Sequence, residues 1–402
     1  MNKKVMALAV AGALAAPGAA LAQASSVQIF GTAYVEYGYF KQGHATPLAT
    51  GSDLVNVDIM QDPGAELGVK GEEALGGGYS VWFQCASSME LLGAGNAART
   101  FCGRNSAIGL KGAFGNVYGG NWDMPMKKTG GIGRLVSDTG LWGVGPLLFG
   151  NSASTIANAA PTQWSNRQNN SIFYDTPVWN GFQLLTGYST IAPANVTGTT
   201  NLSGNKPRMW GLAATYTNGP LVVMGGYENH DNYSPTAAPL LPLTNANDYG
   251  WQVGARYSFG PIVAAAIYTK QVYDTGVIAG ASTGADAKAW GLGAEWTIQG
   301  PHVLRGGYHR AANTGGNFNP GGAGVVAGAL MGNRIYNGGI GATGASIWQI
   351  QYVFNASKRT ELTLGYASLS NDQNARYALG GAAVPAAGEN QNAFGMSWKH
   401  LF

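Results

Sequence analysis

Apolar and polar residues alternate with a period of two along most of the chain. In residues 249–259 every odd position is apolar, from Tyr249 and Trp251 to Phe259, and the positions between them are small or polar. The same alternation returns in residues 210–216, 290–298, 348–354, 362–366 and 394–402. This pattern predicts β-strands with one apolar face and one wet face. No comparable pattern with the helical period occurs, so the sequence predicts an all-β protein.

Short turn sequences join these strands in pairs. They recur at intervals of about 40 residues, which is the spacing expected of a repeated hairpin. They lie at Gly76–Gly78, Phe114–Gly115, Trp179–Gly181, Asn218–Pro220, Gly260–Pro261, Gly300–Pro301 and Asn355–Lys358. Longer Gly/Asn/Thr/Pro-rich connections alternate with the turns, as in outer-membrane barrels. Seven turns join fourteen strands, and the segments Val27–Phe40 and Gln391–Phe402 make sixteen. An even number places both termini on one side, which we expect to be periplasmic.

Composition favours a membrane barrel over a soluble β-protein. Charged residues make up 11% of the chain, against about 25% in an ordinary globular protein. The hydrophobic share of 45% argues against disorder. A net charge of +3 does not indicate the basic surface of a nucleic-acid-binding protein. A soluble sandwich or β-helix could still bury the apolar strand faces. The low charge, the even strand number and the alternating loop lengths together favour the barrel.

The N-terminus indicates export. Lys3 and Lys4 precede an apolar run, and Ala20-Leu21-Ala22 resembles a cleavage site, so residues 1–22 are predicted to be a signal peptide. Cleavage after Ala24 is the alternative. Residues 23–402 are then expected to form one nearly neutral transmembrane β-barrel domain, because no later apolar run reaches the 18 or so residues of a membrane-spanning helix.

Two cysteines, Cys85 and Cys102, occur in this exported chain. In an oxidising compartment a disulfide between them is the default expectation. No neighbouring residues support a redox or metal role.

Several segments resemble a known family. They are Val27–Gly31 (VQIFG), Leu67–Glu73 (LGVKGEE), Leu75–Gly78 (LGGG), Ala107–Gly112 (AIGLKG) and Phe114–Val117 (FGNV). They are similar to segments of the general diffusion porins of Gram-negative outer membranes, especially the betaproteobacterial branch. The terminal Phe402, after an alternating Phe394, Met396 and Trp398, resembles the aromatic assembly signal of that family.

The resemblance implies a 16-stranded antiparallel transmembrane β-barrel with an inward-folded third extracellular loop. It also implies a homotrimer in outer-membrane lipid and lipopolysaccharide, inserted by the barrel-assembly machinery. The 66-residue interval between the turns near 114 and 180 places the constriction loop at about 124–168. The loop carries Lys127, Lys128, Arg134 and Arg167 against Asp138, a net charge of +3. Family members often carry an arginine shortly before this loop, where this chain has Asn121.

Strand parity places further charges in the lumen, because a charge facing lipid at mid-membrane costs about 2–4 kcal/mol. The predicted inward residues are Lys70, Lys111, Arg256, Arg305, Glu36, Glu66, Glu72 and Glu295. Any of these residues could lie at the constriction, or could simply make the inner surface of the barrel polar. Positive groups slightly outnumber negative ones near the expected constriction, which predicts a weak preference for anions.

No catalytic or cofactor site is expected. The five histidines are scattered, with no Ser/His/Asp constellation and no metal-ligand spacing. Gly339–Gly344 satisfies GxGxxG, but it opens a strand rather than a helix. The sequence therefore predicts a passive water-filled channel for ions and small hydrophilic solutes in the cell outer membrane. A substrate-specific channel or adhesive surface protein, and less favourably a barrel enzyme, are the alternatives.

Overall fold

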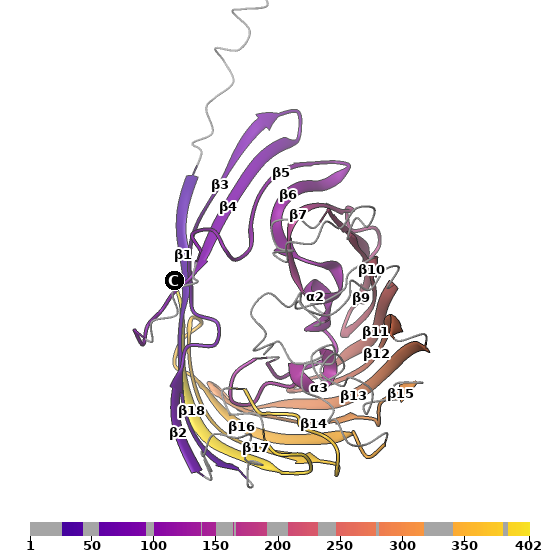
Figure 1. The fold of residues 1–402 in the computed structure, drawn as a ribbon. Helices are drawn as coiled ribbons and strands as arrows, with labels where there is room; N and C mark the ends of the chain where they lie inside the picture. The colour runs from indigo at the N-terminus through magenta and orange to yellow at the C-terminus, as the bar shows by residue number, and fades with distance from the viewer. Residues whose placement is uncertain are drawn as a thin grey trace, which may run out of the picture.

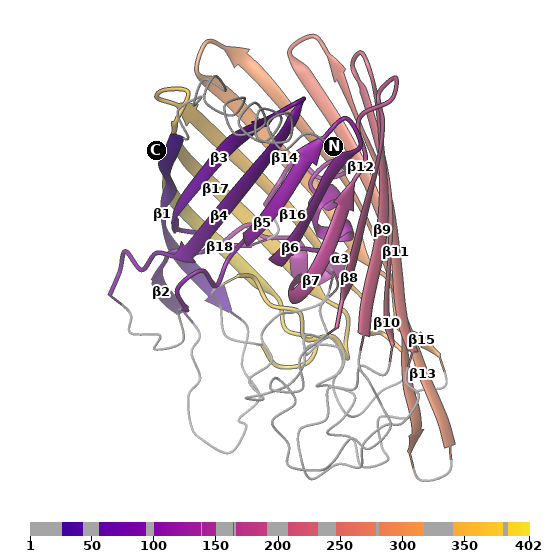
Figure 2. The ribbon, with the colours of Figure 1, turned by 90° about the horizontal axis from the view of Figure 1, so that it is seen from above.

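The computed structural model describes residues 26–42, 56–93, 100–137, 139–149, 164, 166–190, 208–231, 247–278, 281–316, 341–380 and 385–402. Their strands form a ring around an interior that holds two short helices (Figure 1). Seen from above that view, the strands run side by side at a tilt (Figure 2). The predicted signal peptide, residues 1–22, lies outside the described residues. Within the described ranges, no helix is long and apolar enough to cross a membrane.

Eighteen strand segments and two helices make up the described chain. The first nine strands are β1 (Ser26–Gln42), β2 (Asn56–Gln61), β3 (Glu66–Gly76), β4 (Tyr79–Ser88), β5 (Ser106–Gly112), β6 (Gly115–Asp123), β7 (Arg167–Asp175), β8 (Phe182–Ser189) and β9 (Arg208–Asn218). The others are β10 (Leu221–Asp231), β11 (Asn247–Phe259), β12 (Ile262–Ile278), β13 (Ala281–Gln299), β14 (His302–Ala311), β15 (Gly315–Gly316), β16 (Ala345–Asn355), β17 (Thr360–Asn371) and β18 (Gln391–Leu401). The helices α2 (Pro125–Gly130) and α3 (Gly145–Phe149) follow β6.

The eighteen segments form sixteen crossings of one closed antiparallel barrel. β1 pairs with β3 along Ser26–Thr32 and with β2 along Glu36–Lys41, so β2 and β3 occupy one crossing. β15 pairs with β13 beyond the end of β14 and extends that crossing. β18 pairs with β17 on one side and β1 on the other, which closes the sheet. The predicted sixteen-stranded antiparallel barrel is confirmed.

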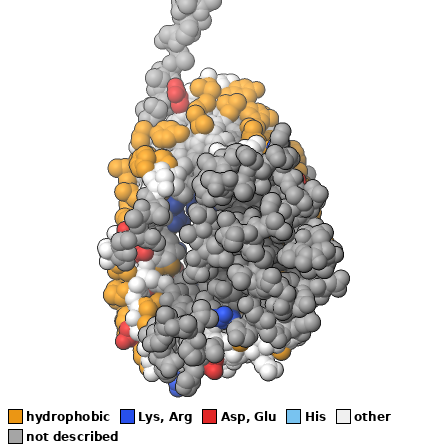
Figure 3. All heavy atoms as spheres, viewed as in Figure 1, with side chains coloured by type: hydrophobic (Ala, Val, Ile, Leu, Met, Phe, Trp, Pro, Cys, Tyr) orange, Lys and Arg blue, Asp and Glu red, His pale blue; other side chains and the backbone are white. Residues whose placement is uncertain are grey.

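The apolar strand faces point outward, as the alternation in β11 illustrates. Val253 is 49% exposed, whereas its neighbour Gln252 is fully buried inside the barrel. Hydrophobic side chains gather over the outer surface of the wall, and Lys or Arg side chains are visible within the ring (Figure 3). Outward aromatic pairs such as Trp251 with Tyr268 and Trp290 with Tyr308 have ring centroids 5.3 and 5.6 Å apart. An apolar outer face of this kind suits a bilayer rather than water.

The repeated Gly-Pro turns follow from backbone geometry. Gly219, Gly260 and Gly300 have φ of +55°, +59° and +55°, and each precedes a proline. Glycine adopts this left-handed conformation without steric cost, which lets the chain reverse between adjacent antiparallel strands. These three turns join β9 to β10, β11 to β12 and β13 to β14, where the sequence predicted them.

The carboxy-terminal residue is tied to the first strand. The Gly31 backbone N–H donates to Phe402 O at 3.0 Å, and the Phe402 N–H donates to Gly31 O at 3.1 Å. The Phe402 ring lies over Gly31, where an added Cβ would come within 2.5 Å of Cζ. Glycine at this position therefore makes room for the terminal aromatic ring.

Candidate functional site: the lumen of the barrel

The segment between β6 and β7 lies against the inner face of the wall. The Gln252 side chain on β11 donates to Met126 O at 2.6 Å, and the Thr269 hydroxyl on β12 donates to Leu148 O at 2.9 Å. Arg256 Nη2 donates to Gly131 O at 2.7 Å. Helices α2 and α3 consequently sit inside the ring of strands (Figure 1). We call Met124–Phe149 the inner segment, its residue 138 lying outside the described ranges.

Glu36 holds the inner segment to the opposite wall. Its buried carboxylate accepts the backbone N–H of Leu141 at 2.9 Å and the Gln61 amide at 2.9 Å, and it also accepts the Tyr34 hydroxyl. Gly140, with φ of +83°, passes so close that an added Cβ would lie 2.6 Å from Glu36 Oε1. The inner segment thus crosses the interior from the β11–β12 wall to β1.

A cavity of about 540 Å³ opens between the inner segment and the wall. Four cationic side chains and two carboxylates line it: Arg134, Arg256, Arg305 and Lys399, with Glu295 and Glu361. Glu295 accepts Arg305 Nε at 2.8 Å. Ser258, Gln351, Thr363 and Ser397 add polar surface. The cavity is therefore wet and carries an excess of positive charge.

Four of these charges are predicted from the sequence, and two are not. Arg134, Arg256, Arg305 and Glu295 were predicted lumen or loop residues, and the structure brings them together. Strand parity also places Lys399 and Glu361 in the lumen. Trp398 and Leu364 point outward, with exposed fractions of 50% and 48%. Lys399 lies one residue from Trp398 and Glu361 three residues from Leu364, so both side chains face the opposite side, inward. Applying the parity rule to the last two strands would have found both.

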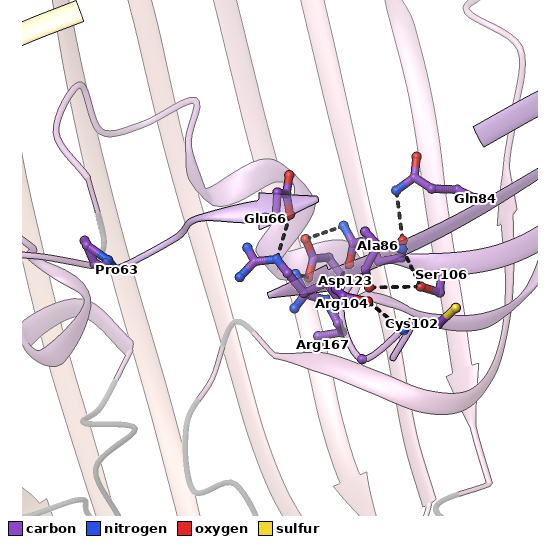
Figure 4. A network of polar contacts seen from close by, with 12 residues as sticks. Pro63, Glu66, Gln84, Ala86, Cys102, Arg104, Ser106, Asp123 and Arg167 are labelled. Carbon is purple, nitrogen blue, oxygen red and sulfur yellow. Dashed lines mark hydrogen bonds and ion pairs between the residues drawn. The ribbon is translucent and has the colours of Figure 1, made fainter. Parts of the chain in front are cut away.

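A second ionic cluster stands where the inner segment leaves β6 (Figure 4). Arg104 Nε lies 2.6 Å from Glu66 Oε2, and Arg167 Nη2 lies 3.1 Å from Asp123 Oδ1. Lys127 Nζ lies 3.5 Å from the same Asp123 oxygen. Three cations thus surround two carboxylates.

Arg104 enters this cluster from just before β5. Asn121 donates to the Arg104 carbonyl at 3.0 Å, so an arginine lies directly beside the position where the sequence analysis noted a missing one. Strand alternation cannot reveal Arg104, because the residue precedes its strand.

Two other predicted lysines are neutralised by acidic partners. Lys128 Nζ contacts Asp175 at 2.7 and 2.8 Å and the Tyr118 hydroxyl at 2.5 Å. Burial lowers the pKa of Lys128, although the neighbouring Asp175 opposes that shift. Lys111 Nζ lies 2.8 Å from Glu72 on the β3 wall. Neither pair leaves a full positive charge facing the lumen.

The remaining predicted residues are placed as follows. Lys70 stands on β3 with its ammonium 5.1 Å from the centre of the Phe30 ring. Asp138 lies outside the described residues.

Cys85 and Cys102 are bonded, with Cα atoms 4.8 Å apart, which confirms the predicted disulfide. Across the described ranges, no group of three His, Cys, Asp or Glu side chains could hold a metal ion.

Comparison with known proteins identifies the family. Residues 7–374 match the model of the Gram-negative porin family. Outer membrane porin protein 32 of Delftia acidovorans is 29% identical over 410 residues, with both chains fully covered. An anion-selective porin from Comamonas acidovorans has a similar fold, with a TM-score of 0.70 at 22% identity over 94% of this chain and 100% of that one. The trimer form of OmpT from Vibrio cholerae gives a TM-score of 0.61 at 12% identity over 94% and 100%. With its closed sixteen-stranded wall, wet interior and apolar outer face, the chain belongs to the Gram-negative porin family and forms a channel in the cell outer membrane.

Proposed function

We propose that this porin is a water-filled diffusion channel for ions and small hydrophilic solutes, narrowed by the inner segment and weakly selective for anions. The observation that carries the proposal is the cavity between the inner segment and the wall formed by β11–β14, β16–β18 and β1. It is lined by polar and charged groups. A wide barrel with such a lining needs no moving part to pass hydrated solutes.

The charge lining favours anions by a small margin. Four cations face two carboxylates around the cavity, but one cation, Arg305, is paired with Glu295. The cluster around Asp123 adds three cations against two carboxylates. Water and salt screen charges more than about 8–10 Å apart, so the excess acts only locally. A modest preference for chloride over potassium is the expected result.

The assembly is proposed to be a homotrimer. Support comes from the similarity of the fold to the OmpT trimer form and from the apolar outer face, which can pack against a second copy or against lipid. The rest of that face would contact outer-membrane lipid and lipopolysaccharide. We assign the exposed terminal ring of Phe402 to recognition by the barrel-assembly machinery.

No catalytic reaction belongs to the proposal. Passive diffusion should show as a size limit rather than as saturation. Proteoliposomes containing the purified protein should swell in arabinose or glucose, more slowly in sucrose, and at rates proportional to the solute gradient. Saturation of the rate with one sugar, at concentrations where other sugars of equal size show none, would contradict passive diffusion and favour a substrate-specific channel.

A further inference from the structure

We propose that the wall formed by β1 and β3–β6 carries a second solute site, which binds small aromatic monocarboxylates. A cavity of about 470 Å³ lies there, apart from the one beside the inner segment. The side chains that line it include Gln28, Lys70, Glu72, Trp82, Gln84, Lys111 and Trp122. This site rests on the proposed function and adds to it a class of solute that binds transiently in the channel.

Aromatic rings form the apolar part of this site. Trp82 and Trp122 meet edge to face with centroids 5.6 Å apart, and Tyr118 packs beside both at 5.4 and 5.5 Å. The Trp82 indole N–H donates to Asn116 Oδ1 at 2.8 Å, which fixes the orientation of its ring. Trp82 is buried and carries the Lys111 ammonium 5.6 Å from its ring centre, so the half-buried Trp122 presents the apolar surface. A ring held in place in this way can pack against a flat solute ring at little entropic cost.

Lys70 supplies the charge that such a solute needs. Across the ranges that the structure describes, no carboxylate oxygen lies within 4.0 Å of Lys70 Nζ, whereas Lys111 is paired with Glu72 at 2.8 Å. Gln28, Lys70 and Gln84 are register partners, so they form one row across β1, β3 and β4. Gln84 Nε2 donates one N–H to Asn105 O at 2.8 Å and keeps the other. The Lys70 ammonium between the Gln28 and Gln84 amides is a donor set suited to a carboxylate.

The same geometry restricts the solute to one negative charge. Glu72 lines the cavity two residues from Lys70 on the same face of β3, so a second carboxylate on the solute would meet a like charge. A small inorganic anion would use Lys70 but not the indole rings. The Lys111 and Glu72 side chains are 44% and 48% exposed, which indicates a wet, open site. Binding should therefore be weak, as a channel requires for the solute to leave again.

The test uses sodium benzoate as the probe on single channels in planar bilayers at 0.1 M KCl and pH 7. Benzoate should reduce the chloride current saturably, and it should do so at about threefold lower concentration than acetate, which lacks the ring, or benzyl alcohol, which lacks the charge. Lys70→Gln and Trp122→Leu should each weaken the effect about threefold. Lys358→Gln, which removes the same charge from the turn between β16 and β17, should leave it unchanged.

Equal effects of acetate and benzoate, or a benzoate effect unchanged by Lys70→Gln, would overturn the inference while the channel function stands. The Lys70 side chain is exposed, so its removal should not impair folding even if Trp122→Leu does. A protein that forms no pores would instead contradict the proposed function. Saturation-transfer NMR on the detergent-solubilised protein then decides the site: a benzoate signal that Lys70→Gln reduces supports it, and an absent or unchanged signal refutes it.

Discussion

The Glu36 carboxylate is expected to hold the inner segment across the lumen. Its removal should release Gly140 and Leu141, which we call the tip of that segment. Glu36 is fully buried, and in the part of the inner segment that the structure describes its backbone partner is the Leu141 N–H, at 2.9 Å. The Gln61 amide and the Tyr34 hydroxyl orient the carboxylate from the wall. The substitution Glu36→Ala deletes the acceptor and leaves the Leu141 N–H unsatisfied.

A hydrogen bond to a charged acceptor contributes about 1.5–3 kcal/mol. Its loss should raise the population of channels with an undocked tip by about tenfold to a hundredfold. The Leu141 side chain packs against Gly38 and Gly395, where an added Cβ would lie within 2.6 Å of it, so apolar contacts remain and docking should weaken rather than vanish. The barrel wall, closed by the β1–β18 pairing, should assemble as before.

Single-channel recordings provide the assay, because an undocked tip changes the cross-section that ions traverse. Glu36→Ala should show excess current noise and frequent transitions between conductance levels, at rates at least about tenfold above those of the parent protein. Glu361→Gln is the control, since it also removes a lumen carboxylate, and Glu361 makes no hydrogen bond to the described residues of the inner segment. Noise and transitions equal to those of the parent would refute the role assigned to Glu36.

Three further outcomes are expected. Replacing both Cys85 and Cys102 by serine should increase proteolysis between these positions but leave the heat-dependent migration of the folded barrel on gels unchanged, because the strand ladder closes elsewhere; loss of the folded band would contradict this. Phe402→Ala should reduce the amount of folded protein in the outer membrane several-fold in quantitative immunoblots, and a wild-type level would remove the proposed assembly role. Arg256→Glu should shift the reversal potential toward cation preference, whereas Lys358→Glu on the turn should shift it much less; equal shifts would show that the cavity charges do not set selectivity.

The strand pattern could be predicted because it is local. The outer face of β11 follows from six alternating apolar residues, and the turn at Gly260 follows from the Gly-Pro pair that permits its positive φ. The disulfide was also predictable, since the chain holds only two cysteines. Each of these features depends on residue types within one strand, one turn or one compartment.

Charge pairing inside the lumen could not be predicted in this way. Lys111 meets Glu72 across 39 positions of sequence, and Lys128 meets Asp175 across 47. Such partners depend on the register of several strands and on the path of the inner segment, which alternation does not encode. The sequence analysis therefore counted both lysines as pore charges. The short helices α2 and α3 were missed for a related reason, because five or six residues cannot display a helical period.

The central claim is a conducting pore in which positive charge slightly exceeds negative charge around the inner segment. The measurement that tests it most directly is the reversal potential of many channels in a planar bilayer under a tenfold KCl gradient. We expect stable ohmic currents and a small potential whose sign shows chloride carried in preference to potassium. A potential of the opposite sign would contradict the selectivity, and the absence of any ionic current from correctly folded protein would contradict the channel itself.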